Sequence, residues 1–288
     1  MTTRSWASWR TWGRGILLVV LAGVFIFPLL WMLSYSLRPL GAPPPTRLDL
    51  FAPPLVFSNY ARLFEVVPLA RYSLNSLLVL VAATPFALLS GSWAGFALSQ
   101  APRPIRWPLL ALSVALLLAP GAALWPSRFI LFARLGWVDS LLPLIAPALM
   151  GNGPFYMLLF YVSFARIPRD VYDSALLDGV GPLRMWASVA LPLARPALVA
   201  ATLLTMADTW SNYADALLYI RAEASYTLPL GIRLLQQLKP TDWPLLMAAS
   251  VLMVAPVFIL FLISQHLFHR HPDIRPDAIY RISTLRRP

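Results

Sequence analysis

Residues 15–37 read GILLVVLAGVFIFPLLWMLSYSL and contain no charged side chain. A helix needs about 20 predominantly apolar residues to cross the hydrocarbon core of a bilayer, so this stretch is long enough to span it. The apolar core of a secretory signal peptide is shorter, about 7–15 residues, and a small-residue cleavage site follows it. Here the chain continues as SLRPLGAPPP from Ser36. We therefore predict a retained transmembrane helix.

Five more stretches are uncharged or nearly so, and the composition supports reading them as spans. Of the 288 residues, 59% are hydrophobic and 12% charged, whereas soluble domains average about 45–50% apolar and about 25% charged residues. We predict an all-α, polytopic membrane protein with six transmembrane helices, the later five at 73–98, 107–127, 140–165, 196–220 and 243–265.

The basic residues predict how the spans are oriented. With the N-terminus inside, the inner side holds 14 arginines and the outer side 9 basic residues, which are spread over longer loops. Basic residues favour the cytoplasmic side, and they count for less in long loops. We expect a cytoplasmic segment at 1–14, a membrane domain at 15–268 and a cytoplasmic tail at 269–288. The net charge of +11 is scattered and forms no continuous basic face, which argues against a nucleic-acid partner.

No catalytic or metal-binding constellation stands out in the sequence. The chain has no cysteine, and its three histidines, His266, His269 and His271, lie near the C-terminus without a supporting acid or cysteine. The phosphate-binding pattern GxxxxGK[ST] does not occur, so any ATP hydrolysis would belong to another chain. We predict no enzyme activity, no metal and no cofactor.

The loop at 168–192 is a polar segment between two strongly apolar spans. Asp170 follows Pro168 and favours a helix start, Asp178-Gly179 favours a break, and Gly181-Pro182 favours a second start. Two apolar stripes at helical spacing predict two short amphipathic helices: Val171, Ala175 and Leu176, then Leu183, Trp186, Ala187 and Ala190. Such a pair could rest on lipid, or it could bind a partner. The aspartates argue against the first reading, because the inner leaflet is itself negatively charged.

This loop resembles the signature of ATP-binding-cassette importer permeases, approximately EAA, three residues to Gly, then IxLP. The corresponding residues are Asp173-Ser174-Ala175, Asp178-Gly179 and 189–192, with Asp and Ser in place of the usual Glu and Ala. Further motifs resemble the carbohydrate branch, which includes the second membrane subunit of maltose importers, over residues 59–268. They are Asn59-Tyr60, Asn75-Ser76, Leu135-Gly136-Trp137 with Asp139-Ser140, Trp210-Ser211-Asn212-Tyr213, 226–231 and 247–250.

The resemblance implies a permease domain in the inner membrane of a bacterial or archaeal cell, importing a sugar or oligosaccharide. Its implied partners are a second homologous permease chain, two ATP-binding-cassette ATPases and an extracytoplasmic solute-binding protein. The residues implied in coupling to the ATPase are Asp173, Ala175, Asp178, Gly179, Trp186, Leu191 and Pro192. The glycine-rich ending usual in this branch is absent from His269 onward.

The fifth predicted span carries two acids, which are costly in a membrane unless they are paired or face water. Their spacing of seven puts them on nearly the same helix face, beside amide and aromatic side chains. In one interpretation these residues form a polar face along which the substrate crosses the membrane. In the other, Asp208 is protonated or hydrogen-bonded to a neighbouring helix, and Asp215 and the aromatic residues lie at the boundary between membrane and water. The candidate residues are Asp208, Trp210, Asn212, Tyr213 and Asp215.

The main functional alternative is an ion-coupled secondary transporter, which would carry its own coupling site, for instance at Asp208, and would need no ATPase. In that case the helix pair at 168–192 would have no partner. A membrane enzyme is disfavoured because the acids and histidines do not converge on one span. Purification together with an ATPase and a second permease would separate these possibilities.

Overall fold

The computed structural model describes residues 3–43, 49–149 and 153–269. These described residues form helices and contain no strand. Backbone proximity divides the chain into two units, one made of 1–70 with 228–255 and the other of 71–227 with 256–288. Each unit is described by itself. The C-terminal tail predicted at 269–288 lies, apart from His269, outside the described residues.

The first unit contains the longest exposed apolar helix of the described chain. Its elements are α1 (Thr3–Ser36), α2 (Ser58–Val66), α13 (Leu228–Leu238) and the first half of α14 (Trp243–His269). The span Arg14–Ser36 has no buried residue in its most apolar window, as expected for a helix surrounded by lipid. Asn59 Nδ2 holds α2 against the end of α1 by donating to the carbonyl oxygens of Ser36 and Arg38, both at 2.8 Å.

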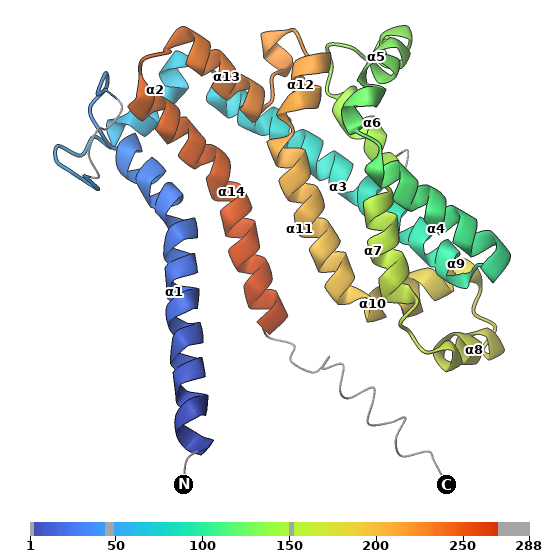
Figure 1. Ribbon diagram of the computed structural model, residues 1–288. Helices are drawn as coiled ribbons and strands as arrows, with labels where there is room; N and C mark the ends of the chain where they lie inside the picture. Colours follow the sequence, from blue (N-terminus) through green and yellow to red (C-terminus); the bar gives the residue numbers. More distant parts are fainter. Residues whose placement is uncertain (1–2, 44–48, 150–152, 270–288) are drawn as a thin grey trace. The chain divides into compact units, whose positions relative to one another are not determined.

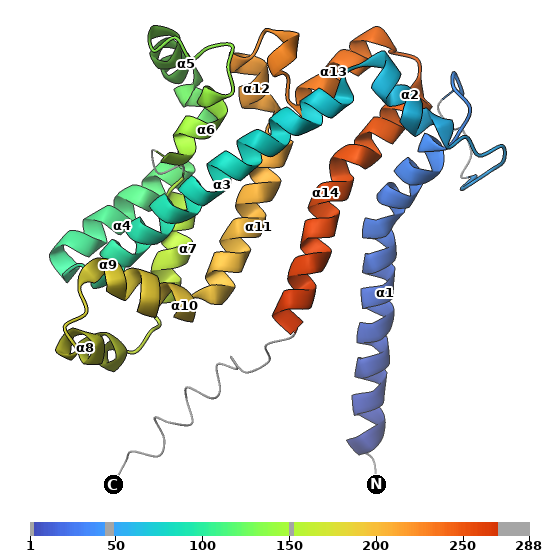
Figure 2. The ribbon, with the colours of Figure 1, turned by 180° about the vertical axis from the view of Figure 1, so that it is seen from behind.

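The second unit holds the remaining helices (Figures 1 and 2). They are α3 (Leu69–Gln100), α4 (Arg103–Leu118), η1 (Gly121–Leu124), α5 (Trp125–Arg134), α6 (Leu142–Leu149), α7 (Pro154–Phe164), α8 (Arg169–Leu177), α9 (Pro182–Met185), η2 (Trp186–Ala190), α10 (Leu191–Leu193), α11 (Arg195–Ser211), α12 (Tyr213–Tyr219) and η3 (Glu223–Ser225). Within this unit α7 packs against both α4 and α11.

The predicted all-α membrane fold is confirmed: four helical segments are long and apolar enough to cross a membrane, and the number reaches six if each of two bent helix pairs is counted as one span. The four segments are Arg14–Ser36, Leu69–Gln100, Leu142–Phe164, which includes the undescribed residues 150–152, and Trp243–Gln265. The bent pairs are Arg103–Leu118 with Gly121–Arg134, at 92°, and Pro182–Leu193 with Arg195–Ser211, at 86°.

Two predicted span boundaries are wrong. The third span, predicted at 107–127, ends at Leu118, because Ala119 precedes Pro120 and a residue before proline disfavours helical backbone. The fifth span, predicted at 196–220, ends at Ser211. Asn212 then leaves the helical conformation and caps α12 by accepting a hydrogen bond from the backbone N–H of Asp215.

Helices α3 and α7 approach each other closely at two glycines one helical turn apart. A Cβ atom on Gly95 would lie 2.8 Å from Met157 O, Phe160 Cβ and Tyr161 N, and one on Gly91 would lie 3.1 Å from Tyr156 Cβ. Small residues four apart let membrane helices pack backbone against backbone, where van der Waals contact is the main source of association. The two glycines therefore fix how α7, and the loop that follows it, sits on α3.

Candidate functional site

Helix α8 ends in a tight glycine turn in the loop that the sequence singles out. Gly179 adopts a φ of +72°, a left-handed conformation that glycine accepts without strain. The N–H of Val180 donates to Ala175 O at 3.0 Å and the N–H of Gly179 donates to Leu176 O at 3.0 Å. This is the hydrogen-bond pattern of a Schellman motif, which satisfies carbonyl groups at the end of α8. The predicted break at Asp178-Gly179 is confirmed.

The chain restarts with Pro182 in the first turn of α9, as predicted, and continues through η2 to α10. The η2 segment, Trp186–Ala190, is a π-helix. The wide turn comes directly before Pro192, whose ring would otherwise press against the carbonyl group of Ser188. Residues 169–193, from α8 to α10, are called the arm below.

The arm rests on an aromatic and aliphatic cluster of the second unit. Trp186 is buried and stacks on Trp93 of α3, with ring centroids 5.6 Å apart. Phe96 of α3 makes an edge-to-face contact with Phe164 at the end of α7, at 5.8 Å. Such ring pairs contribute about 0.5–1.5 kcal/mol each beyond the area they bury. The arm is therefore anchored to α3 and α7 rather than suspended from its two ends.

Tyr172 connects α8 to the same cluster. Its ring lies 6.2 Å from that of Phe96, and its hydroxyl group donates to Phe164 O at 3.2 Å. Burial raises the pKa of Tyr172 to about 12, so the hydroxyl group keeps its proton at physiological pH and remains a donor. Tyr172 thus fixes the orientation of α8.

The predicted apolar stripes are partly wrong. On α8 the buried residues are Tyr172 and Ala175, while Leu176 is exposed. In the second half of the arm Met185, Trp186 and Ala190 are buried, while Leu183 and Ala187 are exposed. A π-helix takes more residues per turn than an α-helix, so the buried positions recur at Trp186, Ala190 and Ala194. A uniform period of 3.6 does not capture this shift.

The structure places the predicted coupling residues in two groups. Ala175 and Trp186 are buried under the arm, and Leu191 is half-buried. The exposed members are Asp173, Asp178, Gly179 and Pro192. Sequence reasoning missed Leu177, next to the turn, which is 90% exposed. The arm thus presents an acidic and apolar outer surface on a rigid base.

The candidate substrate-path residues lie on both sides of the break between α11 and α12. Asp208 is exposed on α11, whereas Trp210 is buried. Asn212 Nδ2 donates to Asp215 Oδ2 at 3.0 Å, and the Asp215 N–H donates to Asn212 Oδ1 at 3.2 Å. This reciprocal pair caps α12. Tyr213, which follows the cap, is half-buried. The acids are therefore separated by a helix break instead of sharing one continuous helix face.

Side chains from separate helices and loops hold the loop that follows α12. Asp139 Oδ1 accepts from the backbone N–H groups of Arg221 at 2.9 Å and Ala222 at 2.6 Å. These two hydrogen bonds, with a smaller contribution from the Arg221 charge, lower the pKa of Asp139. Asn75 Nδ2 donates to Ala224 O and to Tyr226 O, both at 2.9 Å. The Asp139-Ser140 and Asn75-Ser76 motifs thus contribute their first residues to one loop clamp, which sequence spacing alone did not reveal.

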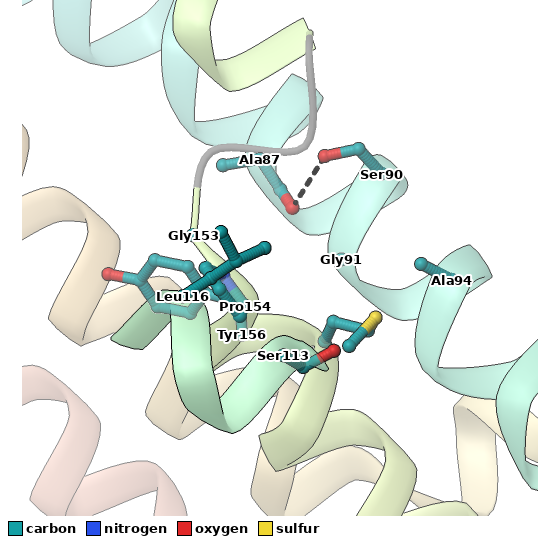
Figure 3. A pocket seen from close by; sticks show the side chains of 10 residues that line it. Ala87, Ser90, Gly91, Ala94, Ser113, Leu116, Gly153, Pro154 and Tyr156 are labelled. Atoms are coloured by element: carbon teal, nitrogen blue, oxygen red, sulfur yellow. Dashed lines mark hydrogen bonds between the residues drawn. The ribbon is translucent and has the colours of Figure 1, made fainter. Parts of the chain in front are cut away.

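A cavity of about 210 Å³ lies between α3, α4 and α7 (Figure 3). Its α3 wall is made of small residues, and its polar groups include the hydroxyl group of Ser90, which donates to Ala87 O at 3.2 Å and Ala148 O at 3.0 Å. None of the predicted site residues lines this cavity.

Comparison with known proteins agrees with this architecture. The chain is 29% identical over 247 residues to the sulfoquinovosyl glycerol transport system permease protein SmoH of Agrobacterium fabrum, covering 83% of this chain and 84% of that one. It is 27% identical over 255 residues to the trehalose/maltose transport system permease protein MalG of Thermococcus litoralis, covering 86% and 89%. A bacterial ABC transporter involved in the import of the acidic polysaccharide alginate contains a chain with the same fold. The TM-score is 0.73 at 23% sequence identity, over 91% of this chain and 98% of that one.

A helical membrane fold with a rigidly anchored polar arm defines a multi-pass transport component. The model of the binding-protein-dependent transport system inner membrane component family matches residues 84–273, and the chain belongs to this family. The matched region contains the arm, the candidate substrate-path residues and Asp139 of the loop clamp, while Asn75 of the clamp lies before it. The resemblance that the sequence motifs suggested is confirmed.

Proposed function

We propose that the chain is a permease subunit of an ATP-binding-cassette importer that carries a sugar or oligosaccharide. The carbohydrate permeases among its relatives support the substrate class. In this proposal a solute-binding protein delivers the substrate to the outer loops. A second, homologous permease chain completes the path, and two separate ATPases supply the energy.

The observation that carries the proposal is the arm. Its outer surface exposes Asp173, Asp178 and Leu177. They surround a turn in which Gly179 adopts a positive φ, a conformation that favours glycine. Its inner surface is locked to α3 and α7 through Trp186 and the aromatic cluster. A force applied to the outer surface would therefore pass into the spans. A helix pair resting on headgroups would have no need of this base.

The membrane orientation follows from the same assignment. For the ATPases to reach the arm, the arm must be cytoplasmic, and with six spans both chain termini are then cytoplasmic as well. The arginine distribution supports this orientation. A membrane-impermeant reagent applied to intact cells should react with a label in the α5 region. It should not reach a label at the N-terminus.

Purification of the full chain from its native host tests the assignment. We expect an ATPase and a second permease to co-purify, and a photo-crosslinker at Leu177 to capture the ATPase. A crosslinker at Leu118, which is 81% exposed in the membrane-spanning helix α4, is the matched control and should capture lipid. If the Leu177 crosslinker captures only phospholipid, the arm lies on the membrane and the proposal is wrong. Purified chain that drives uptake with an ion gradient and no ATPase would instead establish a secondary transporter.

The turn at Gly179 gives a second test. In Gly179→Arg a long side chain projects where the arm would meet the ATPase, whereas Gly179→Asn places a short side chain that tolerates the left-handed backbone. We expect Gly179→Arg to abolish transport at normal membrane abundance and Gly179→Asn to retain most of it. Normal transport by Gly179→Arg would contradict the role of the turn.

A panel of labelled sugars, tested in cells lacking the chain, would identify the substrate.

A further inference from the structure

A polar pocket is lined by residues from the end of α3, the start of α4, the end of α7 and α8. Helix α8 lies at the same end of the second unit as the start of α4 in both views (Figures 1 and 2). The volume of the pocket is about 150 Å³. Its polar lining consists of Ser99, Gln100, Arg106, Arg169, Tyr172 and Asp173. The packing of the arm on its cluster does not explain this pocket, and none of the candidate substrate-path residues lines it.

Arg106 is the unsatisfied group of this pocket. Its side chain is half-buried, and among the described residues no acceptor lies within hydrogen-bonding distance of its buried Nε atom. A buried donor without an acceptor costs free energy, and more so when it is charged. The guanidinium group presents N–H donors in a planar fork that matches two oxygen atoms of a phosphate group.

The charge of the pocket favours an anion. Arg106 and Arg169 supply two positive charges, and Asp173 is the one carboxylate on the described lining. The hydroxyl groups of the lining already donate elsewhere, from Ser99 to Phe96 O at 2.7 Å and from Tyr172 to Phe164 O at 3.2 Å. Gln100 Nε2 donates one N–H to Ser99 Oγ at 3.0 Å. The charged groups left to bind an incoming oxygen are therefore the two arginines, with the second amide N–H of Gln100 as a neutral donor.

The surroundings of Arg106 place the pocket at the level of lipid headgroups. Arg106 lies in the first turn of α4, which begins a membrane-crossing segment. Its neighbours Ile105 and Trp107 are 56% and 63% exposed. Tryptophan is enriched at the boundary between the hydrocarbon core and water, where its ring lies among the headgroups.

We propose that this pocket binds a phosphate-bearing anion, the headgroup of an anionic phospholipid, with Arg106 as the fork and Arg169 as the second cation. The inference takes the side of the membrane from the proposed function, which makes this the cytoplasmic leaflet. Because Arg169 and Asp173 belong to α8, a bound headgroup would hold the arm in place beside the surface that faces the ATPase.

The experiment uses the full chain, with whatever co-purifies, in lipid nanodiscs of phosphatidylcholine with or without phosphatidylglycerol. Native mass spectrometry after stepwise delipidation measures the phospholipid retained. We expect Arg106→Gln to reduce retained phosphatidylglycerol at least about ten-fold, the factor for losing a charged hydrogen bond. Arg169→Gln should weaken retention less. The matched control is Arg103→Gln, which removes an exposed arginine one turn earlier on α4 and should change nothing.

Several outcomes would overturn the proposal. Equal losses in Arg103→Gln and Arg106→Gln would mean a general attraction of positive charge to the membrane. Equal retention of phosphatidylcholine and phosphatidylglycerol by the unchanged chain would exclude an anion site. If inorganic phosphate raises the melting temperature as much as phosphatidylglycerol does, and only when Arg106 is present, the ligand is a soluble phosphate and the lipid source is wrong.

The readouts also separate this inference from the proposed function. If Arg106→Gln loses the co-purifying ATPase but keeps phosphatidylglycerol, the pocket contacts protein and the proposal fails. Lipid retention that depends on Arg106 in a chain without any ATPase would support the pocket and contradict the importer assignment. Arg106→Lys keeps the charge without the fork, so an intermediate loss in a variant of unchanged melting temperature excludes misfolding as the cause.

Discussion

Adding a single methyl group at Gly95 should destabilise the second unit more than the same change at Gly91, one turn earlier on α3. The new Cβ atom would lie 2.8 Å from three atoms of α7, and two of these, Met157 O and Tyr161 N, belong to the backbone. Ordinary van der Waals contact begins at 3.4 Å. The difference, 3.4 − 2.8 = 0.6 Å, is how far these contacts must lengthen to become ordinary ones.

The size of the destabilisation by Gly95→Ala depends on whether neighbouring atoms can move away from the new methyl group. Overpacking a close-packed interior costs about 1–3 kcal/mol when side chains can adjust, and we expect the upper end here because backbone atoms cannot rotate away. Phe160, whose Cβ atom is the third close contact, stacks on Phe164 at 5.8 Å and belongs to the cluster beneath the arm. The strain should therefore reach the arm. At about 2–4 °C per kcal/mol for a chain of this size, the melting temperature should fall by about 6–12 °C.

Two matched glycines calibrate the assay, which is thermal unfolding of the purified chain followed by size-exclusion chromatography. Gly91→Ala meets one tight contact, at 3.1 Å, and should lose less than Gly95→Ala. Gly23→Ala has no neighbour within 4 Å and should lose nothing, since alanine favours helix over glycine by about 1 kcal/mol. A melting temperature for Gly95→Ala equal to that of Gly23→Ala would refute the close packing of α3 on α7.

Three other changes test the clamp and the arm. Asp139→Asn should make the stability of the fold less sensitive to acid. Because the pKa of Asp139 is lowered in the folded state, its carboxylate stabilises the fold above the unfolded pKa of about 4, and this stabilisation is lost as the pH falls through the folded pKa. Melting curves at successive pH values would show the difference. Asn75→Leu leaves two loop carbonyl groups without their donor and should cost about 2 kcal/mol, with faster proteolysis of residues 220–226. Trp186→Ala should cost about 3–5 kcal/mol in unfolding experiments and increase the labelling of a cysteine introduced into the arm, while Trp186→Phe should lose much less.

Local chain chemistry explains why much of the fold could be predicted. Long uncharged stretches have no stable place outside a bilayer, so the first, second and last spans follow from residue type alone. The turn at Gly179 and the helix start at Pro182 were equally accessible, because glycine and proline restrict the backbone by themselves. Asp173, by contrast, was assigned only through its resemblance to the signature of importer permeases.

Other features were not predicted. The third span ends at Leu118 because Ala119 precedes Pro120, a local signal that the length of the apolar stretch concealed. Along the second half of the arm Met185, Trp186 and Ala190 are buried and Leu183 is exposed, a pattern that the 3.6-residue period of an α-helix did not predict across the π-helix.

The sequence by itself determined that this chain lies in a membrane and carries a polar, glycine-turned arm, because hydrophobic length and backbone restriction are properties of neighbouring residues. Only the tertiary structure decided which side of the arm is buried and that Asp139 and Asn75 hold one loop. It also decided that Arg106 and Arg169 line one pocket. Those outcomes depend on contacts between residues far apart in the chain, which are set by packing across the fold.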